Sequence, residues 1–207
     1  MSGWEVEAQY VAPHGEAVPD AGGFVHQLAA NVLERVASTE APQPLLAVVK
    51  IQQRKVLDLA GATLVVIADR ITDPGNLGTM LRSCEAAGAD GIVLLSGSVD
   101  PFNPKVVRAS AGALFHVPVV AAAALHELQA LGLPLLGTSS HKGAQYTDAD
   151  LIAPFALVMG SEAHGVDEQI PIDSWLTIAH GGRAESLNVA MATTVVVFEA
   201  LRQRRAR

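Results

Sequence analysis

Three short stretches of the sequence combine polar side chains with glycine, a pairing suited to binding a small charged molecule. The first, ADRITDPGNLGTMLRSCEAAG, carries Asn76 and Arg82 on an expected helix that follows a strand ending at Asp69. Gly78 lies one helical turn before Arg82, so a ligand could approach the backbone there. Arg82 could then hold a phosphate or polarise a hydroxyl near the N-terminal half of the helix, where the dipole favours anions. The alternative is an Asn cap and a surface arginine.

The second stretch, LVMGSEAHGV, runs from a buried strand into Gly160. Glu162 and Gly165 follow, and glycines on both sides of a carboxylate permit a sharp turn and close approach of a ligand. An ordinary loop after a strand would have the same composition. His164 is expected to be a loop residue.

The third stretch, LTIAHGGRAESLNVAMATTVVVFEAL, leads from a strand ending at Ile178 and Ala179 through two glycines to a long apolar helix. Ser186 is the expected N-cap of that helix. Asn188 then falls in the first helical turn and points to the same end of the domain. In the alternative, Ser186 only caps the helix and Asn188 is solvated.

Strands and helices alternate from about residue 60, which predicts an α/β fold with a parallel sheet and helices on both faces. The expected strands are continuous aliphatic runs, typical of strands buried on both sides: 63–69, 91–95, 117–120, 133–139, 155–160 and 175–179. Helices are expected over 76–88, 103–115, 122–131 and from 186 onward, with Leu77, Leu81 and Cys84 facing the core. Ligands bind at the carboxyl ends of parallel strands, so the three polar stretches should lie at one edge of the sheet.

The N-terminal part has a different character. Residues 1–22 mix Pro, Gly and polar residues without a period, which predicts a loose segment. Residues 23–38 carry a helical stripe of apolar side chains, and residues 45–49 form a short expected strand. The expected organisation is therefore a short N-terminal segment, 1–59, followed by one α/β domain, 60–207.

Composition limits the classes of function. The 207 residues carry a formal net charge of −7, which argues against a protein that coats nucleic acid, so any basic site must be local. The single cysteine, Cys84, cannot form an internal disulfide, and neither a signal peptide nor a long apolar run is present. A soluble cytoplasmic protein is expected. The seven histidines show no ligand spacing, so no metal is expected.

A nucleotide-dependent oxidoreductase is one alternative. The GNLG turn supplies only two glycines of a dinucleotide fingerprint, at the wrong spacing, but Asp100 follows the next strand roughly where a ribose-binding carboxylate would lie. This interpretation leaves the second and third stretches unexplained.

Together the three stretches resemble the SpoU-type RNA 2′-O-ribose methyltransferases of the SPOUT superfamily. The family motifs N-x-G-x-x-x-R, G-x-E-x-x-G and S-L-N-V occur here in the family's order, and the resemblance covers roughly residues 60–204. The matching positions are Asn76, Gly78 and Arg82, then Gly160, Glu162 and Gly165, then Ser186, Leu187, Asn188 and Val189.

The resemblance implies a deep trefoil knot in the C-terminal part, in which S-adenosylmethionine (SAM) binds. The adenosine would lie against Gly160, Ile178 and Leu187, with Thr138 nearby. It further implies a homodimer that forms through the C-terminal helix and the knot region. The implied substrate is RNA, with ribosomal RNA favoured over transfer RNA, and the implied reaction is methyl transfer to a ribose 2′-hydroxyl.

The resemblance also assigns roles to side chains. The family view makes Arg82 the group that deprotonates the hydroxyl. Since arginine stays charged in proteins, an alternative is that Arg82 hydrogen-bonds the developing oxyanion and the adjacent phosphate. A further alternative is that, in a dimer, Arg82 reaches the cofactor site of the other subunit. Asn76, Ser186 and Asn188 would position the ribose and Arg82, and Glu162 would pin its loop or orient Arg82.

Two departures from the family pattern matter. Before the third motif the family has I-P-M-x-G, whereas Ala179 and His180 replace the proline and the methionine here, a change expected to weaken SAM binding. The segment before residue 50 resembles only the end of an L30e-like RNA-binding domain. Both departures favour an alternative function, a SPOUT-like RNA-binding or assembly factor without strong catalysis.

Overall fold

The computed structural model describes residues 3–37, 41–161, 163–183 and 186–206. The chain divides into two compact units, Met1–Gln52 and Gln53–Arg207, and each is described by itself. The sequence predicts the boundary a little later, between residues 59 and 60.

The N-terminal unit contains a small sheet with the strand order β2-β1-β3. Strand β1 (Val6–Val11) lies in the middle, parallel to β2 (Phe24–Gln27) and antiparallel to β3 (Leu45–Val49). The expectation of a loose segment over residues 1–22 is therefore wrong. The buried side chain of Gln9 accepts a hydrogen bond from the Val18 backbone N–H at 2.8 Å and donates one to the Gly22 carbonyl at 2.9 Å, so the segment after β1 is held by a specific side chain.

The helix expected over residues 23–38 is also wrong for its first half. Residues Phe24–Gln27 pair with β1, and only Val32–Val36 are helical (α1). Asn31 has a left-handed backbone with φ 64°, which separates the two elements. Pairing with a strand distant in sequence has overridden the local helical pattern.

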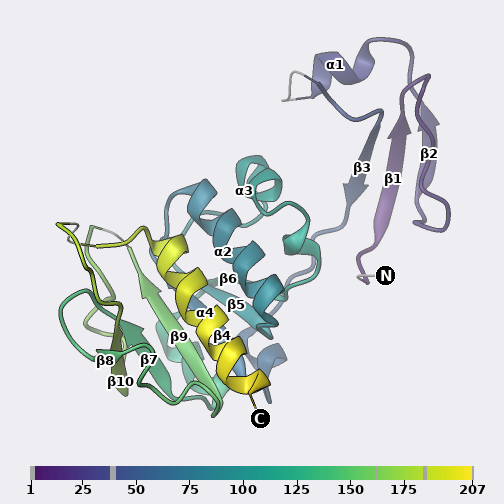
Figure 1. The fold of residues 1–207 in the computed structure, drawn as a ribbon. Coiled ribbons are helices and arrows are strands. Elements are labelled where there is room, and N and C mark those ends of the chain that lie inside the picture. The colour runs from purple at the N-terminus through teal and green to yellow at the C-terminus, as the bar shows by residue number, and fades with distance from the viewer. Residues whose placement is uncertain (1–2, 38–40, 162, 184–185, 207) are drawn as a thin grey trace. The chain divides into compact units, whose positions relative to one another are not determined.

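Within the described part of the second unit, seven strands form one sheet whose pairs are all parallel, in the order β6-β5-β4-β9-β7-β10-β8 (Figure 1). This confirms the predicted α/β fold with a parallel sheet. The strands are β4 (Leu64–Asp69), β5 (Gly91–Leu95), β6 (Val119–Ala123), β7 (Leu135–Thr138), β8 (Ala144–Gln145), β9 (Phe155–Gly160) and β10 (Ser174–Thr177).

Strand β9 follows β7 in the chain but lies between β4 and β7 in the sheet. Its register with β4 runs from Leu64 opposite Phe155 to Asp69 opposite Gly160. The two strands therefore end level with each other, and Asp69 and Gly160 are neighbours at the same edge. Strand β10 is inserted in the same way between β7 and β8.

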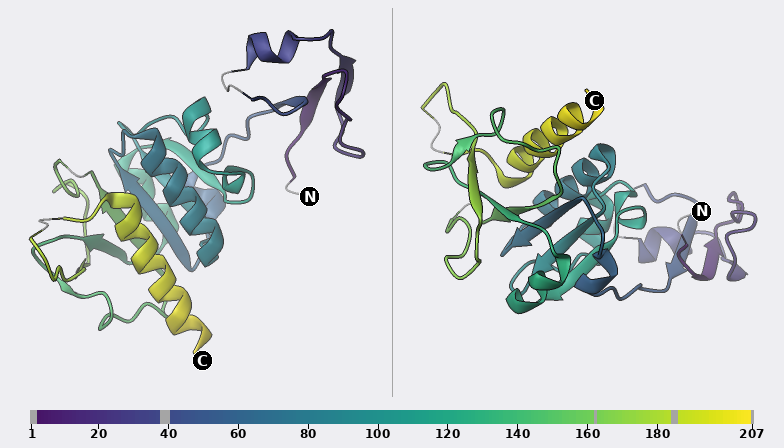
Figure 2. Two further views of the ribbon diagram at one scale, coloured as in Figure 1. Left: turned by 45° about the horizontal axis from the view of Figure 1, so that its top comes forward. Right: turned by 90° about the horizontal axis from the view of Figure 1, so that it is seen from below.

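Two long helices cover one face of this sheet. Helices α2 (Pro74–Ala87) and α4 (Val189–Arg205) lie side by side there (Figures 1 and 2). The opposite face is covered by two 3₁₀ helices, η1 (Val56–Leu59) and η3 (Leu125–Leu131), whose apolar side chains join a second buried cluster. The sequence predicts an α-helix where η3 lies.

The helix expected over residues 103–115 is interrupted. Helix α3 spans only Pro104–Ala109, and a 3₁₀ turn, η2, covers Ala113–Phe115. Between them Ala111 and Gly112 both have positive φ, 48° and 92°. Left-handed residues cannot continue a right-handed helix, so the helix must end there.

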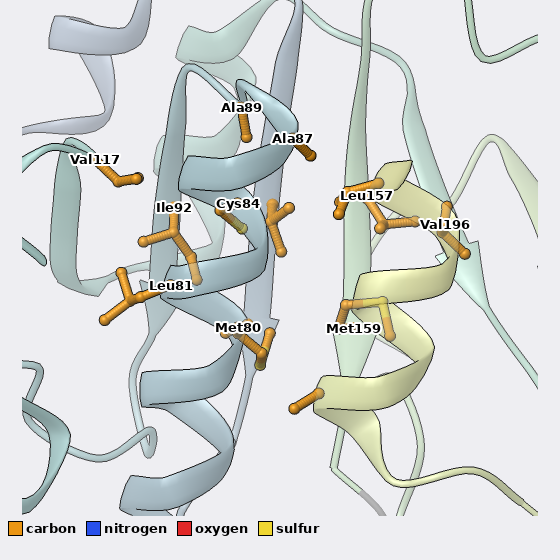
Figure 3. Close-up of a cluster of buried hydrophobic side chains, with 14 of the residues drawn as sticks. Met80, Leu81, Cys84, Ala87, Ala89, Ile92, Val117, Leu157, Met159 and Val196 are labelled. Carbon is orange, nitrogen blue, oxygen red and sulfur yellow. The ribbon is translucent and has the colours of Figure 1, made fainter. Parts of the chain in front are cut away.

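Side chains of β4 alternate between the two buried clusters. Val66 and Ala68 pack on the α2–α4 side, whereas Val65 and Ile67 pack on the side of η1 and η3. Leu81 and Cys84 of α2 are fully buried in the first cluster, as predicted, among the side chains that Figure 3 shows. Burial raises the pKa of the Cys84 thiol to about 12, so this cysteine is a core residue and a poor nucleophile.

Candidate functional site

A cleft of about 660 Å³ lies at the carboxyl ends of β7, β9 and β10, beside the start of α4. That volume suits a small-molecule ligand. Five of the residues proposed from the sequence line it together: Thr138, Gly160, Ile178, Ser186 and Leu187. They come from three strand ends and the approach to α4, which is where the topology of a parallel sheet places a ligand.

Gly160 is required by the tight turn that follows β9. A Cβ atom at this position would overlap the backbone of Gly165 and Val166. Ser161 and Gly165 form an antiparallel bridge, in which the Gly165 N–H donates to the Ser161 carbonyl at 2.8 Å. The turn brings Ser161 and His164 to the cleft. Glu162 falls outside the described residues, so its proposed role stays a prediction.

An ionic network at the edge of the cleft was not predicted from the sequence. Asp69, only 3% exposed, accepts a hydrogen bond from the Asp167 N–H at 2.8 Å and pairs with Arg70 at 3.1 Å. Arg70 also pairs with Asp167 at 3.2 Å. The network ties the end of β4 to the segment after Gly165. The available signal was an acidic residue that ends a wholly buried strand and is followed directly by arginine.

Asn188, and not Ser186, is the N-cap of α4. Its side-chain oxygen accepts hydrogen bonds from the N–H groups of Ala190 and Met191, at 3.0 and 3.3 Å. The amide nitrogen of Asn188 donates to the side-chain oxygen of Asn76 at 2.8 Å. The two asparagines therefore join the starts of α2 and α4. Ser186, the expected cap, is exposed and faces the cleft.

Helix α2 also begins differently from the prediction. Asp73 is its N-cap and accepts a hydrogen bond from the Asn76 N–H at 2.8 Å, with Pro74 as the first helical residue. The alternative in which Asn76 serves only as a helix cap is therefore wrong. Its side-chain oxygen bonds Asn188, which belongs to the third polar stretch.

Gly78 does not provide access for a ligand. A Cβ atom at this position would overlap Ala109 and the backbone of Ser110. The glycine lets α2 and α3 approach closely, so the expectation that a ligand reaches the backbone there is wrong.

Arg82 lies on the exposed surface of α2, in a second cleft of about 720 Å³ that also includes residues of η2 and α4. Its neighbours there include His116 and Phe198. Within the described part of the chain, Arg82 makes no hydrogen bond or ion pair. The two clefts have no lining residue in common, so a single chain does not bring Arg82 into the first cleft.

The first cleft suits a ligand with both polar and apolar parts. Ile178 and Leu187 offer apolar surface, and the ammonium group of Lys142 lies 3.6 Å from the ring centroid of Trp175. His180 also lines the cleft, and its Nε2 atom is buried without a hydrogen-bond partner among the described residues. Sequence reasoning missed Lys142 and Trp175.

Asp100 is not among the residues that line the first cleft; its carboxylate accepts a hydrogen bond from the Phe102 N–H at 2.9 Å, so it does not act as a ribose-binding group there. Among the described residues, no cluster of His, Cys, Asp or Glu could hold a metal ion. Over the same residues, no helix is both long and apolar enough to cross a membrane.

Comparison with known proteins places this geometry in a family. The model of the SpoU rRNA Methylase family matches residues 63–198. The 23S rRNA (guanosine(2553)-2′-O)-methyltransferase RlmP of Bacillus subtilis is 39% identical over 178 residues, which cover 84% of this chain and 71% of that protein. The 23S rRNA (uridine(2479)-2′-O)-methyltransferase of Streptomyces viridochromogenes is 34% identical, over 84% of this chain and 65% of that protein, just under two thirds of its length.

Solved structures agree. The SpoU methyltransferase AviRb from Streptomyces viridochromogenes, in complex with the cofactor AdoMet (SAM), matches with a TM-score of 0.86 and 29% identity, over 100% of this chain and 86% of that one. An AdoMet-bound rRNA methyltransferase from Sinorhizobium meliloti matches with a TM-score of 0.86 and 28% identity, over 98% of this chain and 82% of that one. The chain therefore belongs to the SpoU rRNA methylase family of the SPOUT superfamily.

Proposed function

We propose that this protein is a SAM-dependent methyltransferase that modifies a ribose 2′-hydroxyl of ribosomal RNA. The observation that carries the proposal is the cleft at the ends of β7, β9 and β10, which gathers Thr138, Gly160, Ile178 and Leu187 in a chain of the SpoU family. Relatives of this chain have structures with AdoMet bound. The cleft's apolar wall, which includes Ile178 and Leu187, suits the same cofactor.

Ribosomal RNA is the proposed substrate, in preference to transfer RNA. Two relatives that are 39% and 34% identical carry names that specify 23S rRNA, one at a guanosine and the other at a uridine. The proposal is therefore for the class of RNA, and it implies a cytoplasmic enzyme.

When bound, SAM supplies an electrophilic methyl group for in-line transfer to the hydroxyl oxygen. The protein has to align that oxygen and stabilise the negative charge that develops on it. Arg82 is suited to this role because its planar guanidinium can bond an oxyanion and the neighbouring phosphate at the same time. Asn76, Asn188 and Ser186 would position the ribose, with Glu162 holding the turn after β9.

The complete site is proposed to need a homodimer. Met191 and Phe198, two turns apart on α4, are 62% and 42% exposed, which is unusual for large apolar side chains on one helix face. A second copy that covers this face would bring the partner subunit's Arg82 toward the cleft. This arrangement accounts for the separation of Arg82 from the cleft within one chain.

A trefoil knot in the C-terminal part is the remaining element of the proposal. It is supported by the insertion of β9 between two strands that precede it in the chain, and by the similar insertion of β10. The segments around these two strands also form the cleft.

Calorimetry with SAM, and with NADH as a control, tests the cofactor first. We expect saturable binding of SAM alone. Tritiated SAM is then supplied with rRNA or tRNA, and protection of the modified ribose from alkaline cleavage is mapped. The protein should label rRNA, and Arg82→Lys should bind SAM as before but turn over about 100-fold more slowly.

Three results would contradict the proposal at different points. Absence of SAM binding would favour the RNA-binding or assembly function that Ala179 and His180 suggest. Labelling confined to tRNA would mean that tRNA is the substrate in place of rRNA. Near-normal turnover of Arg82→Lys would remove the proposed role of the guanidinium.

A further inference from the structure

The backbone of Arg70 is strained at the point where β4 ends. This residue directly follows Asp69, the last residue of the strand, and its φ is 55°. Side chains other than that of glycine disfavour this left-handed region, and Asn and Asp are the usual exceptions. Glycine at this position would remove the strain. An arginine that is kept in such a conformation points to a specific function of its side chain.

The side chain of Arg70 bridges two carboxylates from different parts of the sheet edge. Its Nη2 atom lies 3.1 Å from an oxygen of Asp69, and its Nη1 atom lies 3.2 Å from an oxygen of Asp167. Asp69 is only 3% exposed, and a carboxylate so buried needs a positive partner. A planar guanidinium can bond two carboxylates at once in a fixed geometry, which a lysine cannot do.

Asp167 connects this bridge to the first cleft. It lines the cleft, two residues after Gly165, which closes the turn that follows β9. One of its carboxylate oxygens pairs with Arg70, and the other accepts a hydrogen bond from the Gln169 N–H at 2.9 Å. Its own N–H donates to Asp69 at 2.8 Å. Asp167 is therefore held by main chain and side chain together, and it fixes the path of the chain as it leaves the turn.

Arg70 itself is placed to hold the cleft wall and not to bind a ligand. It is not among the residues that line the cleft. Both terminal nitrogens pair with carboxylates, and Nε is shielded from solvent without a hydrogen-bond partner in the described part of the chain. The stem of the side chain lies over the loop after β5, where a Cβ on Gly97 would come within 3.4 Å of the Arg70 Cγ.

We propose, on the basis of the methyltransferase function proposed above, that Arg70 is a positioning residue for the cofactor site. By joining Asp69 to Asp167, it holds the turn after β9 in the form that binds SAM. Strand β4 lies beside β9 in the sheet, so its end provides a fixed reference for that turn. A wall that is already ordered loses less conformational freedom when the ligand binds, so loss of the bridge should weaken binding.

A double-mutant cycle on the bridge tests this role. Arg70→Lys keeps a positive charge beside the buried Asp69 but cannot bond both carboxylates, and Asp167→Asn removes one of the two carboxylates at nearly the same volume. Affinity for S-adenosylhomocysteine is measured by calorimetry. We expect each single variant to bind about fivefold more weakly, and the double variant to bind about as weakly as either, because both changes break the same bridge.

Steady-state kinetics separates positioning from a general loss of folded protein. In Arg70→Lys the KM for SAM should rise about fivefold, while turnover at saturating SAM stays within about twofold of the unmodified protein. Partial unfolding would instead lower turnover at an unchanged KM.

Ala122→Gly is the matched control for backbone strain. Ala122 also has a positive φ, 52°, but it is an exposed residue of β6 and does not line the cleft. Substitution by glycine relieves a left-handed backbone at either position. Arg70→Gly should bind S-adenosylhomocysteine at least fivefold more weakly, about as for Arg70→Lys or worse, whereas Ala122→Gly should bind it as tightly as the unmodified protein.

Each contrary result has a distinct meaning. Unchanged affinity in Arg70→Lys and Asp167→Asn would overturn the positioning role and leave the methyltransferase function intact. Losses that add in the double variant would show that the two residues act separately, so the bridge would not be the cause. Weaker binding by Ala122→Gly would attribute the effect to the backbone and not to the Arg70 side chain. If the unmodified protein did not bind S-adenosylhomocysteine, both this inference and the proposed function would fail.

Discussion

At the scale of single residues, Asn188 makes two separate sets of hydrogen bonds with one amide group. Its oxygen caps α4, and its nitrogen bonds Asn76 at the start of α2. A residue that only capped the helix could be Ser, Thr or Asp equally well. Asparagine has both an acceptor and a donor in one short side chain, so it can also fix the distance between two helix starts.

This double role predicts different outcomes for two substitutions. Asn188→Ala loses both interactions and should reduce the free energy of unfolding by about 1 kcal/mol as well as impairing methyl transfer. Asn188→Ser keeps a good cap but is too short to reach Asn76. Its stability should therefore stay close to that of the unmodified protein while methyl transfer falls. Denaturant titration and initial rates measure the two effects. Full activity of Asn188→Ser would make the Asn76 contact dispensable.

At the scale of elements, the turn after β9 depends on the absence of a side chain at Gly160. The position is crowded by the backbone of Gly165 and Val166, and backbone atoms cannot rotate away as a flexible side chain can. This turn also brings Ser161 and His164 to the cleft. Packing of the main chain therefore shapes the proposed cofactor site directly.

Gly160→Ala should destabilise the protein by about 3 kcal/mol, because overpacking against backbone forces the turn to shift. Gly181→Ala is the matched control from the third polar stretch, since a Cβ there meets nothing within 4 Å and the residue has no positive φ. Chemical denaturation of both variants checks the difference. Equal, small effects would mean that the turn adapts to a methyl group.

The elements that the sequence predicts well are those with a local cause. Strands β4, β5 and β9 are continuous aliphatic runs, and α2 carries a stripe of buried apolar side chains, although it begins two residues earlier than predicted. The wrong predictions concern residues that interact with residues distant in the sequence. Phe24–Gln27 is a strand because it pairs with β1, and Asn188, the cap of α4, also bonds Asn76, which lies 112 residues away in the sequence.

The same distinction applies to the site. Gly160, Ile178 and Leu187 could be placed because motifs and strand ends mark them. The network of Asp69, Arg70 and Asp167 could not be predicted, because the sequence does not specify that β9 lies beside β4. That neighbour relation is what brings the ends of the two strands level.

At the scale of the whole molecule, the main feature is the separation between the two clefts. Arg82 and the residues of the first cleft belong to motifs of one family, yet the cleft that contains Arg82 shares no lining residue with the first cleft. A dimer in which each subunit completes the other's site would reconcile the motifs with the geometry, and the exposed apolar face of α4 offers a surface for it.

Mixing two inactive variants tests this arrangement. Arg82→Lys retains the cleft, and Leu187→Glu retains Arg82 but should block the cleft. If sites are shared between subunits, exchange in a 1:1 mixture should restore about a quarter of normal activity, because about half the dimers are mixed and each has one intact site. If each chain works alone, the mixture should stay inactive. Sedimentation of each variant checks that dimers form.

The position of β9 also has a consequence for the order in which the chain can assemble. A growing chain completes β4 through β7 first, and it has to leave a vacancy between β4 and β7 until β9 arrives. Pairings between segments so far apart in sequence form slowly. Gly160 ends β9, and Ile178 follows β10, so the walls of the cleft are among the last parts of the sheet to form. Incompletely folded chains should therefore lack the cofactor site altogether, and acquisition of cofactor binding would time the final step of folding.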